Sequence, residues 1–286
     1  MKITYLILAH NFPGQLERMI ELLDHPQAAF IIHVDKKADI KQFSTPKLLG
    51  LKNLSFLKNR LTINWGGFNM VEATLRMMKK AVMPNEKGYL VLLSGQDFPL
   101  KPADYIYNFL NHNYGTEYLE YFSLPDNRWV NKGMDRLAYY HFVDKLGPDE
   151  SRQLYLLQKK ERKTIRPYFE NFIPYGGSQW WAFTTECAYY ILKYIEYNKI
   201  FKEFYELTYI PDEMFFQSII LNSPFKESVT YNNLRYIDWQ TGPEYPRIFT
   251  SEDLKDILQS GRLWARKFSA DRDPLILDQL EENILS

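Results

Sequence analysis

Short apolar runs alternate with amphipathic segments along the first hundred residues of the chain. The runs are rich in β-branched and aromatic residues, so they predict buried strands. These predicted strands are residues 3–9, 30–34, 54–57 and 89–93. Apolar residues recur at helical spacing over residues 15–23 and 68–83, and Pro84 would end the second helix. Strand, helix and strand in this order predict a mixed, Rossmann-like α/β sheet flanked by helices, with ligands beyond the carboxyl ends of the strands.

The apolar pattern weakens between residues 114 and 174, which we interpret as a variable, substrate-facing insertion. Within and after it, the predicted strands are residues 117–122, 176–183 and 236–239, the predicted helices are residues 153–169, 186–197 and 271–285, and residues 242–246 are a predicted loop. Thr250, with Asp253 three residues later, predicts a capping box for a helix that reaches about residue 258. We predict one domain over residues 1–286, with a nucleotide-binding half to about residue 112 and an acceptor-binding and catalytic half from about residue 113.

The stretch from Pro211 to Phe216 predicts the first turn of a short buried helix. Proline suits the first helical position, acidic residues suit the positive end of the helix dipole, and the following residues are mostly apolar. Such a helix would carry the carboxylate of Glu213 to the edge of a pocket. Local sequence leaves two explanations of Glu213 open: it complements the helix dipole, or it is a functional carboxylate.

Charged residues follow the predicted strands at the edge where a sheet of this type binds its ligand. Asp35 comes after the second strand and Asp97 after the fourth. An aspartate at a strand end binds a ribose or base, or it caps a loop through its own backbone, and Asp97 has the pattern of a turn former. Near the C-terminus, the pair Arg266-Lys267 is either ordinary surface charge or, given its apolar surroundings, a site for a diphosphate leaving group.

Composition narrows the class of protein. Thirty-five basic and thirty-five acidic residues give no net charge, so no nucleic-acid partner is expected. The single Cys187 excludes an internal disulfide, and residues 1–9 lack the pattern of a signal peptide, so a cytoplasmic location is expected. No apolar run reaches the roughly 20 residues of a membrane span, so any membrane contact is expected to be peripheral, at the inner face. No metal is expected, because no Asp-x-Asp motif stands where a nucleotide-sugar enzyme of this sheet type usually holds a divalent ion.

Seven motifs follow one another along the chain in a specific order. They are His33-Val34-Asp35-Lys36-Lys37, Trp65-Gly66-Gly67, Asp97-Phe98-Pro99-Leu100-Lys101, Gly177-Ser178-x-Trp180, Pro211-Asp212-Glu213-x-Phe215-Phe216, Asn233-Leu234-Arg235-x-x-x-Trp239 and Ala265-Arg266-Lys267-Phe268. This ordered set resembles the core-2/I-branching β-1,6-N-acetylglucosaminyltransferase and peptide O-xylosyltransferase family over about residues 3 to 275. The Trp-Gly-Gly and Asn-Leu-Arg stretches are more similar to the xylosyltransferase and plant branches than to the animal core-2 branch.

The resemblance implies a GT-A type, inverting, metal-independent transferase that uses a UDP-sugar. It implies that Glu213 is the catalytic base and that Arg266 and Lys267 bind the diphosphate in place of a metal. The other implied donor contacts are Ala9, His10, Asp35, Trp65, Gln179 and Trp180, with Arg247 and Thr250 as alternatives for a further phosphate contact. Gln179 stands where the xylosyltransferases have aspartate, so the donor sugar, GlcNAc or xylose, stays open.

General chemistry agrees with these implied roles. An acceptor hydroxyl loses its proton as it attacks the anomeric carbon, so Glu213 alone would suffice as general base. Fixed cations stabilise the departing UDP without a metal. The acceptor would be a glycan, lipid-linked or free, recognised by Glu120, Arg128 and Arg136 of the insertion. Two other interpretations remain: an inactive carbohydrate-binding protein on the same fold, and a sugar hydrolase, which needs a second carboxylate roughly 5–10 Å from Glu213.

Overall fold

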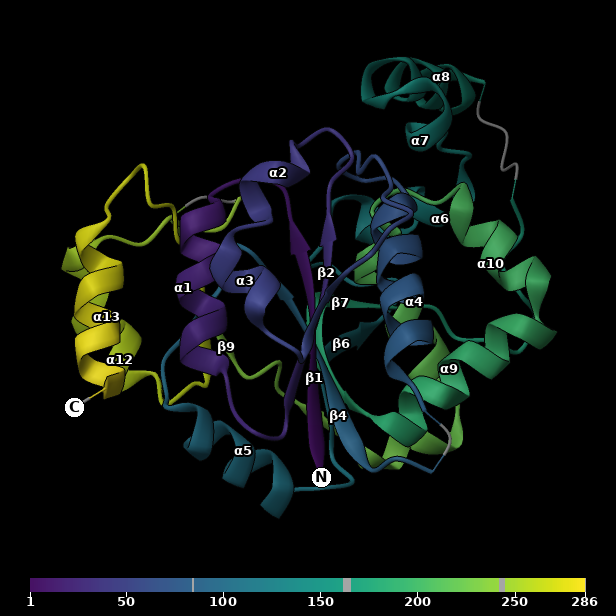
Figure 1. Cartoon of the computed structure of the whole chain (residues 1–286). Helices are drawn as coiled ribbons and strands as arrows, with labels where there is room; N and C mark the ends of the chain where they lie inside the picture. The colour runs from purple at the N-terminus through teal and green to yellow at the C-terminus, as the bar shows by residue number, and fades with distance from the viewer. Residues whose placement is uncertain (84, 162–165, 242–244, 286) are drawn as a thin grey trace.

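The fold is built on a seven-stranded mixed sheet that runs through the centre of Figure 1. The structure is a computed structural model that describes residues 1–286 except 84, 162–165, 242–244 and 286. The strand order is β3-β2-β1-β4-β7-β6-β8. Strands β3, β2, β1 and β4 are parallel to one another, whereas β7 is antiparallel to both β4 and β6. The predicted mixed α/β sheet is therefore confirmed.

Continuous apolar runs form the central strands because both faces of the sheet are covered. The strands of this sheet are β1 (Lys2–Ala9), β2 (Ala28–Val34), β3 (Leu54–Phe56), β4 (Gly88–Ser94), β6 (Glu117–Ser123), β7 (Tyr175–Thr184) and β8 (Val229–Tyr231). Every residue of β4 is buried, and so is every residue of β1 after Lys2. In the centre, Ile7 of β1 lies opposite Ile32 of β2 and Leu93 of β4, so the carboxyl ends of these three strands lie level with one another.

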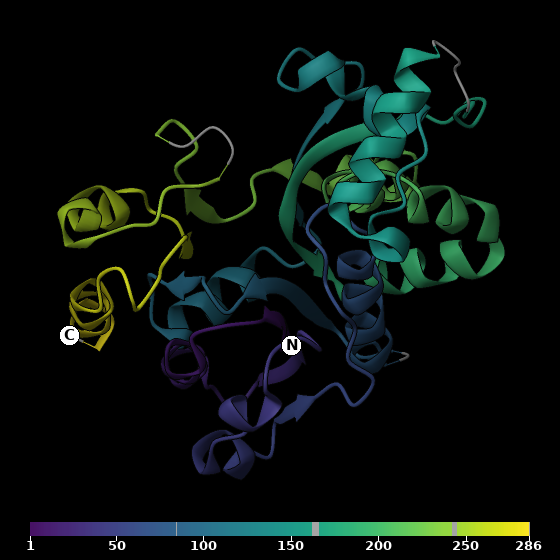
Figure 2. The same cartoon turned by 90° about the horizontal axis from the view of Figure 1, so that it is seen from above.

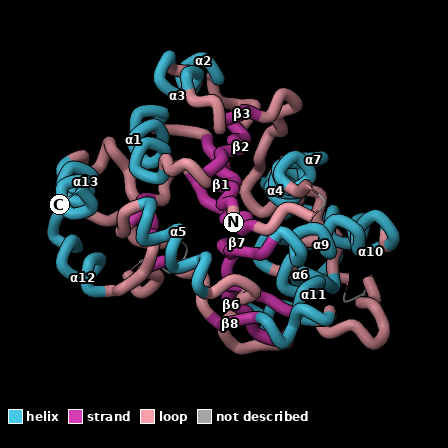
Figure 3. The backbone as a smooth tube through the Cα atoms, turned by 60° about the horizontal axis from the view of Figure 1, so that its bottom comes forward, coloured by secondary structure: helices cyan, strands magenta, loops and turns pink. Residues whose placement is uncertain are grey.

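Helices cover both faces of the sheet, and each face has its own hydrophobic core (Figure 3). One core lies under α1 (Pro13–Leu23), α2 (Ile40–Phe43), α3 (Pro46–Gly50), α5 (Ala103–His112), α12 (Leu254–Gln259) and α13 (Leu275–Leu285). The other lies under α4 (Asn69–Ala81), α9 (Thr185–Tyr197), α10 (Lys199–Glu206) and α11 (Phe215–Leu221). Among the described residues, no helix combines the length and the apolar character that crossing a membrane requires.

The insertion and the loops add short helices at the upper edge of the sheet in Figure 1. The α-helices there are α6 (Asp135–Ala138), α7 (Val143–Leu146) and α8 (Pro148–Lys160). The 3-10 helices of the chain are η1 (Val130–Gly133), η2 (Pro211–Glu213), η3 (Pro224–Ser228) and η4 (Ser251–Asp253). Figure 2, seen from above, shows how β7 curves away from the parallel strands toward these helices.

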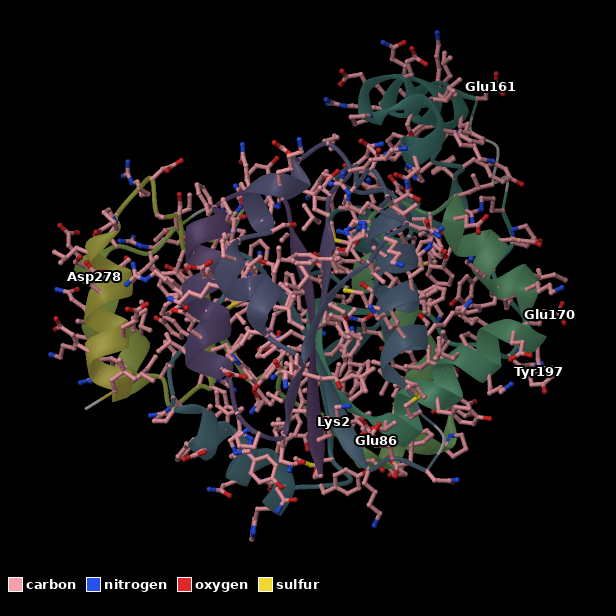
Figure 4. The ribbon with its side chains drawn as sticks, viewed as in Figure 1. Lys2, Glu86, Glu161, Glu170, Tyr197 and Asp278 are labelled. Carbon is pink, nitrogen blue, oxygen red and sulfur yellow. The ribbon has the colours of Figure 1, made fainter. Side chains whose placement is uncertain are left out.

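A second, three-stranded sheet joins the C-terminal part of the chain to the end of β4. Its order is β5 (Phe98–Pro99), β10 (Trp264–Arg266) and β9 (Arg235–Ile237). The outermost helix, α13, is tied to α1 by Arg18, which pairs with Asp278 at 2.6 Å and with Glu281 at 2.5 Å. Figure 4 shows Asp278 on this outer helix. The C-terminal segment is thereby held beside the strand ends.

Some predicted boundaries differ from the structure. The predicted helix 153–169 is α8, which ends at Lys160; residues 162–165 lie outside the described residues, and Arg166 to Phe169 form no helix. The predicted helix 271–285 begins at Leu275, because the carboxylate of Asp273 accepts the backbone N–H groups of Leu275 and Ile276 and so caps it there. Pro84 and residues 242–244 of the predicted loop also lie outside the described residues. The capping box of Thr250 and Asp253 is confirmed.

The turn that carries Glu213 also differs from its prediction. Pro211–Glu213 is a separate 3-10 turn, because Met214 leaves the helical conformation at φ −137° and α11 begins only at Phe215. The chain enters the turn through Ile210, whose N–H donates to the carbonyl of Gly66 at 3.0 Å. Glu213 is therefore not in the first turn of an α-helix but directly precedes Met214, the N-cap residue of α11.

Candidate active site

The carboxyl ends of β1, β2 and β4 meet where the sequence predicts donor contacts. The N–H of Asp35 donates to the carbonyl of Ala9 at 2.8 Å, and the N–H of Gly95 donates to the carbonyl of Leu8 at 2.9 Å. These bonds extend the parallel pairing beyond the strands, so Ala9 and Asp35 lie side by side. The Asp35 carboxylate accepts the N–H of Lys37 at 2.9 Å and lies 3.7 Å from its ammonium nitrogen. Asp35 therefore caps its loop, as one of its two sequence interpretations expected.

His10 connects this strand end to the C-terminal cations. Desolvation lowers the pKa of His10, the charge of Lys267 lowers it further, and the charge of Asp35 opposes both. These electrostatic couplings indicate that the imidazole, the carboxylate and the ammonium group face one local environment. The structure thus brings together three residues that lie far apart in the sequence.

Arg266 and Lys267 sit at the end of β10 in a desolvated setting. The Arg266 side chain is only 11% exposed, and its guanidinium carbon lies 4.1 Å from the ring centre of Trp180. Burial lowers the pKa of Lys267, and the neighbouring charge of Arg266 lowers it further. Paired cations in such a site are electrostatically costly unless an anion compensates them. This is the condition that favours binding of a diphosphate.

Asp97 and Arg235 belong to this cluster, although the sequence analysis gave them no role in it. Asp97 is fully buried and accepts a hydrogen bond from Nη1 of Arg266 at 2.8 Å. Its other oxygen lies 3.6 Å from Nε of Arg235, whose side chain is also fully buried. Asp97 forms the expected turn as well, since it accepts the N–H of Ser94 at 3.1 Å. The available signal was the position of Asp97 three residues after the end of the central strand β4.

Two glutamine side chains fix the cationic segment to the sheet. Gln15 of α1 donates to the carbonyl of Gly95 at 3.0 Å and to that of Phe268 at 3.4 Å. Its own side-chain oxygen accepts the N–H of Ala270 at 3.1 Å. Gln96 donates to the same Phe268 carbonyl at 3.4 Å, and its own carbonyl accepts the Phe268 N–H at 3.0 Å. Neither glutamine was predicted, and local sequence carries no signal for them because their partners lie far along the chain.

Glu213 pairs with a cation from the insertion. Nη1 of Arg136 donates to Oε2 of Glu213 at 2.8 Å, and both side chains are partly exposed. The guanidinium of Arg136 also stacks on Trp129, 3.7 Å from the ring centre. Beside them, Asp212 is buried: burial raises its pKa to about 7, the charge of Glu213 contributes, and Arg136 opposes the rise. The predicted base and one predicted acceptor residue thus lie in direct contact.

The Trp-Gly-Gly motif lies against the turn that carries Glu213. Gly66 has a φ of +80°, and the ring of Tyr209 occupies the space that a Cβ would take, so glycine is required here. Trp65 is about half exposed and meets Tyr209 edge to face at 5.7 Å. Trp65 therefore lies beside the residues that lead into the turn of Glu213, and the carbonyl of Ile63, two residues before it, accepts from the Lys37 ammonium group at 2.6 Å.

The remaining predicted donor residues have partners within the protein. Nε2 of Gln179 lies 2.7 Å from the sulfur of Met70, and the next residue, Trp180, is the ring beneath Arg266. Arg247 pairs with Asp253 at 2.9 Å. The Thr250 side chain is part of the capping box, so the capping interpretation accounts for this residue fully.

The other two predicted acceptor residues have partners other than Glu213. Burial raises the pKa of Glu120, and the charges of Arg262 and Arg235 oppose that rise, so this carboxyl faces the arginine cluster. Arg128 is half exposed, pairs with Asp126 at 2.8 Å and covers the ring of Phe122 at 3.8 Å. Within the described residues, no group of three His, Cys, Asp or Glu side chains is arranged to hold a metal ion. An anion at the carboxyl ends of the strands would therefore be bound by cations such as Arg266 and Lys267 and by hydrogen-bond donors.

Comparisons with known proteins give a consistent relationship. The model of the Core-2/I-Branching enzyme family matches residues 3–258. Xylosyltransferase 2 of Rattus norvegicus is 26% identical over 304 residues, covering 98% of this chain and 33% of the relative. Xylosyltransferase 1 of Canis lupus familiaris is 24% identical over 307 residues, covering 98% of this chain and 30% of the relative. The chain thus spans about a third of the length of these relatives.

Two solved structures match the chain only at low similarity. The galactosyltransferase LgtC, in complex with donor and acceptor sugar analogues, has 9% identity and a TM-score of 0.43 over 98% of this chain and 95% of its own. Mouse xyloside xylosyltransferase 1, in its apo form, has 9% identity and a TM-score of 0.41 over 93% of this chain and 97% of its own. The family model, which covers most of the sequence, is the decisive finding: this chain belongs to the Core-2/I-Branching enzyme family.

Proposed function

We propose that the chain is an inverting, metal-independent glycosyltransferase that moves a sugar from a UDP-sugar to a hydroxyl acceptor. The observation that carries the proposal is the desolvated cation pair Arg266-Lys267 beside the ends of the parallel strands. A partly exposed carboxylate, Glu213, stands on a neighbouring turn and supports the proposed base. Family membership supports the transferase class.

In the proposed reaction, the acceptor oxygen attacks the anomeric carbon as the bond from that carbon to UDP breaks. The acceptor proton passes to the Glu213 carboxylate, and the electron pair of the broken bond goes to the β-phosphate oxygen. Attack from the face opposite UDP inverts the anomeric centre. General-base catalysis by one carboxylate contributes about 10²–10⁴ in rate. Arg266 and Lys267 stabilise the charge that develops on UDP, which is the role a divalent ion has in metal-dependent transferases.

The proposed donor and acceptor follow from the names of the relatives and from the resemblance to branching enzymes. Relatives that are named xylosyltransferases support xylose, and the resemblance to branching enzymes supports GlcNAc. The acceptor is a glycan, free or lipid-linked, approached from the insertion that holds Arg136. The reaction is proposed to take place in the cytoplasm, or at the inner face of the membrane where a lipid-linked acceptor would lie. The half to about residue 112 is proposed to bind the nucleotide, and the half from about residue 113 to bind the acceptor and to carry the catalytic residues.

The test is a two-part experiment on one variant, Glu213→Gln. Calorimetric titration with UDP, UDP-GlcNAc and UDP-xylose, in buffer with EDTA, is expected to give binding to both wild type and variant, because the substitution keeps the shape of the side chain. Release of UDP from the bound donor, with water or a test glycan as acceptor, is expected to fall by about 10²-fold or more in the variant.

Glu203→Gln is the matched control, because Glu203 is an exposed glutamate on α10. Its UDP release should equal that of the wild type. Wild-type turnover in Glu213→Gln would remove Glu213 from the mechanism. Absence of nucleotide binding to the wild type would overturn the transferase proposal, and binding that appears only with added Mn²⁺ would overturn its metal-free part.

A further inference from the structure

Asp97 is the acidic side chain that pairs with both arginines of the cationic cluster, Arg235 and Arg266, and its geometry is specific. The residue is 0% exposed, and a fully buried carboxylate is tolerated only when it is paired and hydrogen-bonded. Its Oδ1 accepts from Nη1 of Arg266 at 2.8 Å, and its Oδ2 accepts from the N–H of Ser94 at 3.1 Å. Both oxygens are therefore held in fixed directions, one by the end of β4 and one against Arg266.

Arg235 supports Asp97 without being available to a ligand. Its side chain is fully buried, its Nη1 donates to the carbonyl of Asn233 at 2.6 Å, and its Nη2 donates to the carbonyl of Leu92. Its Nε lies 3.6 Å from Oδ2 of Asp97. Burial lowers the pKa of Arg235 to about 10, and the charge of Asp97 opposes that decrease. Arg235 is thus a structural cation, held by two backbone carbonyls, that faces the second carboxylate oxygen of Asp97 as an ion-pair partner.

Arg266 differs from Arg235 because most of its donors are unused. In the part of the chain that the structure describes, the hydrogen bond to Asp97 is the one that its side chain makes. One face of its guanidinium plane is held by Trp180 at 4.1 Å. A planar guanidinium fixed on one face and at one nitrogen keeps its remaining N–H groups in a defined direction, which is the arrangement that suits phosphate oxygens.

The charges of the cluster fit an anionic ligand. The three cations Arg235, Arg266 and Lys267 outnumber the carboxylates that act on the arginines, Asp97 and Glu120. A diphosphate would supply further negative charge. Without Asp97, the two buried arginines would lose the anion that makes their burial tolerable.

We propose that Asp97 is a positioning residue: held by Arg235 and the end of β4, it orients Arg266 over Trp180 for the diphosphate of the donor nucleotide. This inference rests on the proposed function, because it assigns Arg266 to the diphosphate. For the change in UDP affinity when Asp97 is removed, it predicts the opposite sign to that expected from the charges alone. Removing a negative charge beside a diphosphate site should tighten binding by Coulomb attraction. If Asp97 orients Arg266, its removal weakens binding instead.

The experiment measures UDP and uridine affinity by calorimetry for wild type, Asp97→Asn, Arg266→Gln and the double variant. Asp97→Asn is expected to lower UDP affinity about tenfold or more and to leave uridine affinity within about twofold, because uridine lacks the diphosphate. In the Arg266→Gln background, the same change at Asp97 should have little further effect on UDP, since the residue through which it acts is gone. Thermal unfolding checks that each variant is folded.

Asp97→Ser is the second variant, because its small side chain leaves room for water to accept from Arg235 and Ser94 if asparagine is not tolerated. UDP affinity that is unchanged or tighter, with uridine binding intact, would overturn the positioning role and leave the transferase proposal standing. Effects of Asp97 and Arg266 that simply add would also overturn it. Parallel loss of UDP and uridine binding would mean that Asp97 only maintains the fold, and a wild type that does not bind UDP would overturn both proposals.

Discussion

The ion pair between Arg136 and Glu213 defines the site at the level of single residues. Two adjacent carboxylates, Asp212 and Glu213, share one nearby cation, which is itself held flat against Trp129. The cation opposes the rise in the pKa of the buried Asp212. In the free protein, the proposed base is thus paired with a residue that we expect also to meet the acceptor.

Arg136→Ala should therefore change the pH dependence of the reaction. Asp212 loses the positive charge that opposes the rise in its pKa, so it stays protonated to higher pH, and a limb of the kcat/KM profile that reports this carboxyl should move up in pH. The measurement is UDP release across pH 4 to 9 for wild type and variant. Arg272→Ala, which removes an exposed arginine before α13, is the control and should leave the limb in place. A profile that does not move in Arg136→Ala would show that Arg136 has no influence on the carboxyl that the profile reports.

At the level of elements, the curved strand β7 links the two sides of the site. Gly177 pairs with Tyr121 of β6 next to a shift in register. A Cβ on Gly177 would overlap the carbonyl oxygen of Glu120 and approach the backbone of Tyr121, and neither of these groups can rotate away. Glycine thus permits the close approach of β6 to β7, and β7 is the strand that carries Gln179 and Trp180.

Gly177→Ala should destabilise the protein by about 1–3 kcal/mol, because the backbone of β6 has to shift to make room. It should also weaken UDP binding, since Trp180 lies three residues further along the displaced strand. Urea unfolding and calorimetry give the two measurements. Gly14→Ala is the matched control: nothing lies within 4 Å of the new methyl group, and Gly14 is in a helix. That variant should have unchanged or slightly higher stability, by up to about 1 kcal/mol, and equal destabilisation of the two variants would contradict the steric argument.

Elements that depend on a local sequence pattern could be predicted from the sequence. Those that depend on contacts between residues far apart in the chain could not. Strands β1 and β4 were predicted because strands covered on both faces need continuous apolar runs. At Glu213 the local pattern predicted a helix, whereas the structure has a separate turn. The chain enters that turn through the hydrogen bond from Ile210 to Gly66, a contact that no local pattern encodes. Similarly, local sequence predicted the turn at Asp97, whereas its partner Arg266 is 169 residues away.

For the molecule as a whole, the buried residues of the central sheet include titratable groups with opposite pH effects. Burial lowers the pKa of His33 to about 4, and the neutral ring accepts the N–H of Leu61 at 2.9 Å. Burial raises the pKa of Glu117 to about 7. Between about pH 7 and 4, the unfolded chain binds more protons than the native state at His33, so this residue loses stability as pH falls. Over nearly the same range, the native state binds more protons at Glu117, so that residue loses stability as pH rises.

Because these effects oppose each other, a variant that removes one of them should change the slope of stability against pH. His33→Gln keeps an acceptor for the Leu61 N–H and removes the titration of the imidazole. The change in the free energy of unfolding from pH 7 to pH 5 should therefore be more favourable to the folded state in the variant than in the wild type, by about 2 kcal/mol. Urea unfolding at pH 7, 6 and 5 measures this difference, and Glu117 contributes equally to both proteins and cancels. His112→Gln, at the exposed end of α5, should follow the wild type. A His33→Gln slope equal to that of the wild type would mean that the imidazole is protonated in the native state without cost.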